Sequence, residues 1–201
     1  MRFVTFTRQP RGSWRDARPG LWLSDAGAIL DLVDWMARTG LRAPLDPPVH
    51  YADWFDLDGP WPGLARGANA QAADAGRLAE WRDAGLVLPF DGTTLLAPVP
   101  RPGKIVCVGL NYRDHAAEAR MPVPEWPLLF AKYPTAVVGN GAEIELPTSS
   151  ERVDYEAELA VVIGRRTRRA TSAGALDAVF GYTNANDVSE RDMQAVDGQW
   201  W

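Results

Sequence analysis

The sequence predicts an α+β fold that is rich in β-structure and divided into two units. The composition, with 46% hydrophobic and 23% charged residues, is that of a folded globular protein, and 201 residues suffice for one large domain or two small ones. Apolar residues in the first half recur at both strand and helix spacings. The second half contains several short apolar runs bounded by turn residues, which are typical of strands.

The first unit is expected to begin with two strands and a helix. The strands are expected at residues 2–7, which alternate in polarity, and at residues 21–23. Ser24 or Asp25 can cap a helix, and Gly40 can end it. The apolar residues that would form the buried face of this helix, at the i, i+3, i+4, i+7 spacing, are Ile29, Leu32, Val33 and Met36.

A proline-rich loop and a second helix follow. Residues 44–63 contain five prolines among acidic and aromatic residues, which favours a loop, and residues 68–84 have the spacing of an amphipathic helix. Residues 97–103 contain three prolines and a glycine, as a stiff connector does. The sequence therefore predicts an N-terminal α+β domain at residues 1–97 and a second domain at residues 98–201.

Charge and cysteine content exclude several classes of protein. The net charge of −5 offers no basic field for a nucleic acid or an anionic membrane surface. Cys107 is the single cysteine, which excludes an internal disulfide and indicates a reducing compartment. The sequence contains no apolar run of membrane-spanning length, so a cytoplasmic protein is expected. Only Lys104 and Lys132 could supply a titratable amine.

The second unit begins with a candidate catalytic pair. The apolar run at residues 105–108 predicts a buried strand, and Asn111 can cap the helix that follows. His115 and Glu118 stand three residues apart on this helix, so their side chains share one face. A carboxylate beside an imidazole can orient it and raise its basicity, as a general base requires. An ordinary surface pair has the same spacing and is, on spacing alone, the simpler interpretation.

A strand predicted at residues 154–164 would bring two carboxylates together. With a period of two, Asp154, Glu156 and Glu158 share one face, and the run that ends at Ile163 is expected to be buried on both sides. The Cα atoms of Glu156 and Glu158 would lie roughly 7 Å apart, close enough for both carboxylates to reach one hard cation. All-oxygen ligation favours Mg²⁺, Mn²⁺ or Ca²⁺ over Zn²⁺. An edge strand with a solvated acidic face fits the pattern equally well.

Asp187 offers a third carboxylate. It follows a strand predicted at residues 180–184 and precedes Ser189, which can cap another helix together with Asp192. Ligands are often held where strands end, so Asp187 is a candidate metal ligand. By itself it is more simply explained as a turn or capping residue.

Four stretches together resemble the fumarylacetoacetate hydrolase family. They are residues 104–118, 129–132, 154–164 and 182–192. Their order and spacing are specific and cover nearly all of the predicted second domain, while the first resembles the family's variable N-terminal domain. The resemblance implies a β-rich roll, in which a mixed sheet wraps on itself, and a homodimer assembled through that domain.

The resemblance also implies a role for each candidate residue. By the match to the family's Glu-x-Glu strand, Glu156 and Glu158 would bind Mg²⁺ or Mn²⁺, with Asp187 as the third carboxylate. By the match to the family's Asn-Tyr-x-x-His helix, His115 would be the base that activates water, paired with Glu118.

The reactions of the family act on small oxo-acids. Its members cleave a carbon–carbon bond of a β-diketo acid or acylpyruvate, decarboxylate oxaloacetate-like acids, or isomerise dienoates of aromatic catabolism. Lys132, in a stretch like Phe-x-Lys, would lie near the substrate's carboxylate. The expected function is metal-dependent hydrolysis of a carbon–carbon bond. The alternatives are 2-hydroxyhepta-2,4-diene-1,7-dioate isomerase and oxaloacetate decarboxylase.

The sequence departs from the family after the Asp187 region. Typical members continue with a segment like Arg-x-Lys-Ser-Phe-Asp, whose lysine helps to bind the oxyanion, and with the strands that close the roll. This sequence ends at Trp201, before that lysine is expected, and neither Lys104 nor Lys132 replaces it by position. A C-terminally shortened homologue, catalytically impaired and able only to bind a metal or an oxo-acid, is therefore a further alternative.

Overall fold

The structure is a computed structural model that describes residues 1–41, 51–194 and 196. It is of mixed α and β structure and rich in β-strands, as predicted. The chain forms two compact units. The first unit comprises residues 1–101, 138–142 and 159–184, and the second comprises residues 102–137, 143–158 and 185–201.

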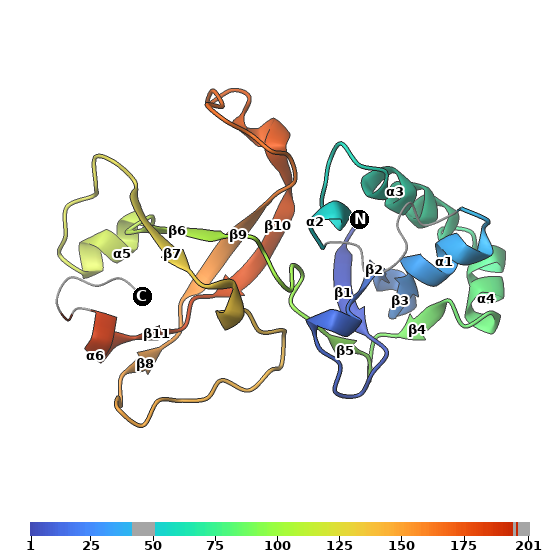
Figure 1. Ribbon diagram of the computed structural model, residues 1–201, viewed down its shortest axis with the longest axis horizontal. Helices are drawn as coiled ribbons and strands as arrows, with labels where there is room; N and C mark the ends of the chain where they lie inside the picture. The colour runs from blue at the N-terminus through green and yellow to red at the C-terminus, as the bar shows by residue number, and fades with distance from the viewer. Residues whose placement is uncertain (42–50, 195, 197–201) are drawn as a thin grey trace. The chain divides into compact units, whose positions relative to one another are not determined.

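A five-stranded antiparallel sheet forms the centre of the first unit, in the order β4-β3-β2-β1-β5 (Figure 1). The strands are β1 (Phe3–Thr7), β2 (Arg18–Leu23), β3 (Ala28–Asp31), β4 (Val87–Pro89) and β5 (Thr94–Leu95). The predicted strands at residues 2–7 and 21–23 correspond to β1 and to the end of β2. Single-turn 3-10 helices at Trp14–Asp16 and Ser24–Ala26 connect the first three strands.

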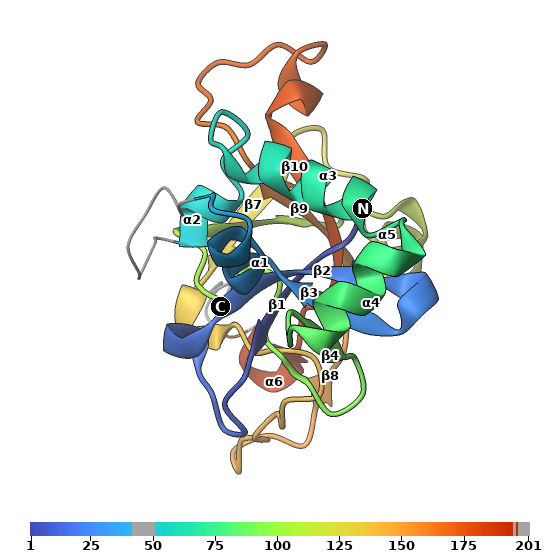
Figure 2. The same ribbon diagram turned by 90° about the vertical axis from the view of Figure 1, so that its right-hand side faces the viewer.

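Helices cover one side of this sheet, as Figures 1 and 2 both show. They are α1 (Leu32–Arg38), α2 (Tyr51–Trp54), α3 (Trp61–Gln71) and α4 (Ala75–Asp83). Helices α1 and α3 contact β2, and α4 contacts β4. The core between them contains the buried indoles of Trp35 and Trp81, which meet edge to face with ring centroids 6.2 Å apart. No helix among the described residues is long and apolar enough to cross a membrane.

The first predicted helix was placed too early in the chain. Ile29, assigned to its buried face, lies in β3 opposite Leu88 and Trp22. The helix begins at Leu32, and the carboxylate of Asp31 caps it by accepting hydrogen bonds from the first-turn amides. A strand forms because the fully buried run that ends at Asp31 completes the sheet, and this burial outweighs the helical spacing.

The proline-rich loop and the second helix also differ from the prediction. Part of the predicted loop, residues 42–50, lies outside the described residues. Helix α3 begins inside the predicted loop, at Trp61, because Pro62 in a first turn removes no hydrogen bond that the helix needs. The predicted helix at residues 68–84 is divided at Asp74, whose side chain caps α4 by accepting a 2.7 Å hydrogen bond from an amide of its first turn.

Two long strands contribute residues to both units. Strands β9 (Ala157–Ile163) and β10 (Val179–Asn186) pair with each other. The ring of Phe180 lies 5.1 Å from the rings of both Phe3 and Phe55, within the first unit. This packing explains why residues 159–184 belong to the first unit, although the sequence assigned them to the second domain.

In its described residues, the second unit contains short strand pairs and two short helices. Strands β6 (Ile105–Gly109) and β7 (Leu128–Lys132) are antiparallel, as are β8 (Val153–Asp154) and β11 (Ser189–Glu190). Helix α5 (Arg113–Glu118) follows β6, and α6 (Arg191–Gln194) follows β11. Further 3-10 turns lie at Pro134–Ala136, after β7, and at Ala175–Ala178, before β10.

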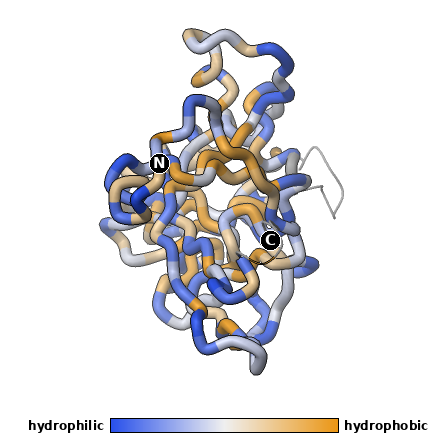
Figure 3. The backbone as a smooth tube through the Cα atoms, turned by 90° about the vertical axis from the view of Figure 1, so that its left-hand side faces the viewer, coloured by the Kyte–Doolittle hydropathy of each residue, from blue (hydrophilic) through white to orange (hydrophobic). Residues whose placement is uncertain are grey.

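The apolar strands are less buried than the sequence predicts. Val106 of β6 is 59% exposed, and Leu159, Val161 and Ile163 of β9 are exposed as well, at 58% for Leu159. Both strands alternate between half-buried and exposed residues, so each has one covered face and not two. Each belongs to a two-stranded sheet, and no layer among the described residues covers the other face. Figure 3, which colours the backbone by hydropathy, shows several hydrophobic stretches of the chain.

Candidate functional site

The two glutamates of the Glu-x-Glu motif lie on the less exposed face at the start of β9. Glu156 directly precedes the strand and Glu158 is its second residue, and both are half-buried, whereas Tyr155 and Leu159 are exposed. The period-two prediction is therefore confirmed for this pair. It fails for Asp154, which belongs to the separate strand β8 and is exposed, because the chain leaves the extended pairing between Asp154 and Ala157.

Asp187 lies directly after β10 and next to the start of β9. Its backbone amide donates a 2.9 Å hydrogen bond to the carbonyl oxygen of Glu156. In return, the side-chain Oδ1 of Asn186 accepts a 3.1 Å hydrogen bond from the amide of Glu156. Asp187 and Glu156 come from distant parts of the sequence, and these two bonds hold their backbones together.

The predicted helix cap after Asp187 is wrong. Ser189 is buried in β11 and its hydroxyl donates to the carbonyl of Asp187, so it does not cap a helix. Glu190 caps α6 instead, because its two carboxylate oxygens accept hydrogen bonds from the amides of Asp192 and Met193. Likewise, α5 begins after Tyr112 without the predicted side-chain cap from Asn111.

Two cations pair with the carboxylates. Nζ of Lys132 forms an ion pair with Oδ1 of Asp187, whose side chain is 12% exposed. Nη2 of Arg191 lies 2.6 Å from Oε1 of Glu156 and 2.9 Å from Oδ2 of Asp154. Lys132, predicted to lie near the substrate's carboxylate, thus contacts Asp187, and Arg191 is a site residue that the sequence motifs did not indicate. The charged run at residues 190–192, directly after Asp187, was the available signal.

The charges of all three predicted ligands act on the thiol of Cys107 in β6. Burial raises the pKa of the Cys107 thiol above its ordinary value, and the negative charges of Asp187, Glu158 and Glu156 raise it further, against the opposing charge of Lys132. Cys107 lies opposite Phe130, and Lys132 lies opposite Ile105, so Cys107 and Lys132 occupy the same face of the pair. Sequence reasoning used Cys107 only as an indicator of compartment.

The donor set suits a hard divalent cation. Oδ1 of Asp187 is buried and pairs with the ammonium of Lys132, so a divalent cation would have to take the place of this ammonium. In the described residues, however, no group of three or more His, Cys, Asp or Glu side chains is arranged so that it could hold a metal ion. Lys132 and Arg191 pair with Asp187 and Glu156 there.

The predicted catalytic pair lies on helix α5. His115 and Glu118 are both exposed, and Ala116 is the residue that anchors the helix by burial. Among the described residues, neither a hydrogen bond nor an ion pair joins the side chains of His115 and Glu118 to each other or to the carboxylates. The helix itself is therefore confirmed, while the orienting role of Glu118 stays a prediction.

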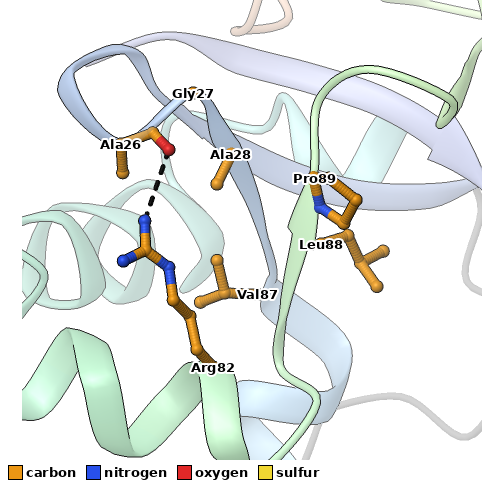
Figure 4. A pocket seen from close by; sticks show the side chains of 7 residues that line it. All are labelled: Ala26, Gly27, Ala28, Arg82, Val87, Leu88 and Pro89. Carbon is orange, nitrogen blue, oxygen red and sulfur yellow. Dashed lines mark hydrogen bonds between the residues drawn. The ribbon is translucent and has the colours of Figure 1, made fainter.

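The first unit contains a separate pocket of about 290 Å³ (Figure 4). Its lining residues are Ala26, Gly27, Ala28, Arg82, Val87, Leu88 and Pro89. Nη2 of Arg82 donates a 3.3 Å hydrogen bond to the carbonyl oxygen of Ala26, so the charged group is already engaged with the pocket wall. None of the predicted site residues lines this pocket.

Comparison with known proteins identifies the second half of the sequence. The profile of the fumarylacetoacetate (FAA) hydrolase C-terminal domain matches residues 104–201, which include every predicted site residue. Residues 104–201 therefore have the sequence pattern of the fumarylacetoacetate hydrolase family. The order of the Asn-Tyr-x-x-His, Glu-x-Glu and Asp187 motifs is thus a property of a fumarylacetoacetate hydrolase domain and not a coincidence of short patterns.

Relatives within the fumarylacetoacetate hydrolase family have several activities. A mitochondrial oxaloacetate tautomerase of Bos taurus is 49% identical over 116 residues, which are 57% of this chain and 37% of the relative. The crystal structure of maleylpyruvate hydrolase from Sphingobium sp. SYK-6, in complex with manganese(II) and pyruvate, is similar with a TM-score of 0.64 and 27% identity. The similarity covers 95% of this chain and 60% of that one.

A third relative is an isomerase. The 2-hydroxyhepta-2,4-diene-1,7-dioate isomerase of Mycobacterium marinum has a TM-score of 0.60 and 28% identity, covering 100% of this chain and 59% of that one. These structural similarities extend beyond residues 104–201, so they include the N-terminal unit. The chain spans less than half the length of the curated relatives that it matches.

Proposed function

We propose that the protein is a divalent-metal-dependent enzyme that acts on small 2-oxo acids. The observation that carries the proposal is the backbone hydrogen bond of 2.9 Å that joins Asp187 to Glu156, with Glu158 on the same half-buried face at the start of β9. These three carboxylates would hold Mg²⁺ or Mn²⁺, with Ca²⁺ as the alternative, since oxygen ligands suit all three ions.

The proposed chemistry assigns separate tasks to the ion and to the chain. A bound divalent ion would polarise a carbonyl oxygen of the substrate and stabilise the negative charge of an enolate. His115 would take a proton from water at a ring nitrogen, and Glu118 would orient the imidazole. Once Lys132 no longer pairs with Asp187, its ammonium would bind a carboxylate of the substrate.

The reaction we propose is hydrolysis of the carbon–carbon bond of an acylpyruvate or another β-diketo acid. It is supported by the family pattern of residues 104–201 and by similarity to the maleylpyruvate hydrolase. The second candidate is keto–enol tautomerisation of oxaloacetate, supported by the 49% identity of the Bos taurus tautomerase. Tautomerisation needs proton transfer but no activated water, so the two reactions differ in their dependence on His115.

Metal binding is the first test of this proposal. Calorimetric titration of the purified chain with Mn²⁺ and Mg²⁺ should show saturable binding, which Glu156→Ala should abolish because it removes one of three ligands. Glu151→Ala, which removes an exposed glutamate outside the proposed set, is the matched control and should bind as the wild type does. Unchanged binding in Glu156→Ala would refute the ligand assignment.

Turnover distinguishes the candidate reactions. With Mn²⁺ present, hydrolysis of acetylpyruvate would yield acetate and pyruvate, detectable by chromatography, and His115→Asn should reduce the rate by about a hundredfold or more. Conversion of enol-oxaloacetate to the keto form, followed by ultraviolet absorbance without release of a second product, would support the tautomerase instead. Metal binding without either turnover would favour a protein that only binds.

The remaining proposals concern the partner and the compartment. We propose a homodimer, as the family resemblance implies, with a small oxo-acid as substrate and no nucleic acid or membrane partner. The cytoplasm remains the expected compartment, although the Bos taurus relative is mitochondrial. Cell fractionation of the organism that carries the sequence tests this expectation.

A further inference from the structure

The guanidinium of Arg191 lies between two carboxylates. Its Nη2 is 2.6 Å from Oε1 of Glu156 and 2.9 Å from Oδ2 of Asp154, and its Nε donates to the same Asp154 oxygen at 3.2 Å. On the remaining side, Nη1 donates a 2.9 Å hydrogen bond to Oε1 of Gln194. All three guanidinium nitrogens of Arg191 therefore donate a hydrogen bond.

The partial burial of this group makes the pairing with Glu156 strong. The side chains of Arg191 and Glu156 are 23% and 25% exposed, whereas that of Asp154 is 50% exposed. A carboxylate that has lost most of its hydration is costly unless a cation neutralises it. Hydrogen bonds from Arg191 lower the pKa of Asp154, and the two carboxylates raise the pKa of Arg191 although burial acts against this.

We propose that Arg191 is the counter-ion of Glu156 in the metal-free protein and competes with the divalent cation for this carboxylate. The inference rests on the proposed function, because it takes Glu156 as a metal ligand. A guanidinium and a divalent cation repel each other at contact distance, so the ion can bind fully only when Arg191 leaves Oε1. The more exposed Asp154 provides a second partner on which the guanidinium can remain. Arg191 thus offsets the charge of Glu156 while no metal is bound and lowers the affinity of the site for the metal.

Mn²⁺ titration of the full chain tests this competition. Arg191→Gln removes the cation and keeps a side chain of similar length, so the dissociation constant for Mn²⁺ should fall about tenfold, a common size of coupling between two ligands. Arg152→Gln is the matched control. Arg152 pairs with Asp192 at 3.4 Å and is 69% exposed, so its loss changes the net charge equally without touching Glu156. We expect less than a twofold change in the control.

The possible outcomes separate this inference from the proposed function. If the wild type binds Mn²⁺ and Arg191→Gln binds it no more tightly, the counter-ion role is refuted and the metal site stands. If Arg191→Gln binds Mn²⁺ and the wild type does not, the competition is confirmed in its strongest form. If neither binds Mn²⁺, both the inference and the metal site are refuted.

A conservative variant covers the case in which Arg191→Gln does not fold. Arg191→Lys keeps the charge, but an ammonium cannot span two carboxylates as the guanidinium fork does. Its Mn²⁺ affinity should therefore lie between those of the wild type and Arg191→Gln, about threefold tighter than the wild type. Circular dichroism and the melting temperature of each metal-free variant establish folding, and unchanged or weaker binding in folded Arg191→Lys contradicts the proposal.

Discussion

At the scale of single residues, Lys132 and Asp187 show how closely the charges of the second unit are balanced. Asp187 is largely buried, and the ammonium of Lys132 is the cation beside its Oδ1. The two residues are far apart in the sequence, so no spacing rule could pair them. Sequence reasoning identified both as functional candidates and had no means to predict their contact.

Lys132→Met should destabilise the metal-free protein by about 2 kcal/mol, because it leaves the buried carboxylate of Asp187 without a cation. The free energy of unfolding is measured by urea titration in the presence of a chelator. Lys104→Met removes the other lysine of the chain, which is exposed and forms no ion pair among the described residues, and should change stability by less than about 0.5 kcal/mol. Equal effects of the two substitutions would contradict the structural role of the pair.

At the scale of elements, Asp31 joins three strands and a helix of the first unit. Its fully buried carboxylate accepts hydrogen bonds from Arg8, which follows β1, and from Arg18 on β2 at 2.7 and 3.0 Å. It also caps α1 through the amides of Val33 and Asp34. One side chain at the end of β3 thus accepts hydrogen bonds from Arg8, from β2 and from the first turn of α1.

Asp31→Ala should therefore destabilise the first unit by about 3 kcal/mol or more, since it removes a helix cap and leaves Arg8 and Arg18 with only the more exposed carboxylate of Asp34. Asp74→Ala removes the exposed cap of α4 and should cost only about 1 kcal/mol. Urea unfolding followed by tryptophan fluorescence compares the two, because Trp35 and Trp81 lie in this core. Similar losses would show that Asp31 acts as a cap alone.

The ion pair between Asp58 and Arg165 supplies a pH-dependent contact within the first unit. Hydrogen bonds from Arg165, of 2.8 to 3.1 Å, lower the pKa of Asp58 below its ordinary value of 3.8. A carboxyl group whose pKa is lower in the folded state stabilises the fold above its unfolded pKa. This contribution is lost as the pH falls through the lowered value.

Asp58→Asn should accordingly lower the melting temperature at pH 7, and the difference from the wild type should disappear near pH 2, at the lower end of carboxyl titration. Calorimetric scans at both pH values measure it. Asp91→Asn, in an exposed turn, is the control and should leave the melting temperature unchanged at either pH. A difference that persists in acid would mean that Asp58 acts through packing.

The sequence predicts helices and strands best where a pattern of neighbouring residues determines the local conformation. Strands β1 and β10 and helix α5 follow from short-range alternation or spacing, and the face shared by Glu156 and Glu158 follows from the two-residue period. Ile29 was misassigned because the covering sheet decides its conformation, and Arg191 was overlooked because its partner Glu156 lies 35 residues away. Patterns within about ten residues thus determine element types, and long-range pairing determines the site's charge balance.

At the scale of the whole molecule, the uncovered apolar strand face predicts association. Exposed contiguous apolar surface is typical of interfaces, and we expect the proposed homodimer to bury the β9 face that contains Leu159, Val161 and Ile163. Sedimentation equilibrium should find a dimer, which Leu159→Lys weakens by about tenfold or more by burying a charge. Leu176→Lys changes an even more exposed leucine outside the strands and should leave the dimer intact. A wild-type monomer would refute the expectation.

The strands β9 and β10 also limit how the molecule can be divided. A cut at the sequence boundary near residue 98 would keep every predicted metal ligand on one fragment. That fragment would contain Phe180 without its ring contacts Phe3 and Phe55. Gly164, which leaves no room for a side chain beside the carbonyl of Phe55, is also on this fragment. It would lose its hydrogen-bonded neighbour Leu57. If N-terminal halves are exchanged between related proteins, Gly164 must therefore stay a glycine, and the new half must supply aromatic rings that contact Phe180 as Phe3 and Phe55 do.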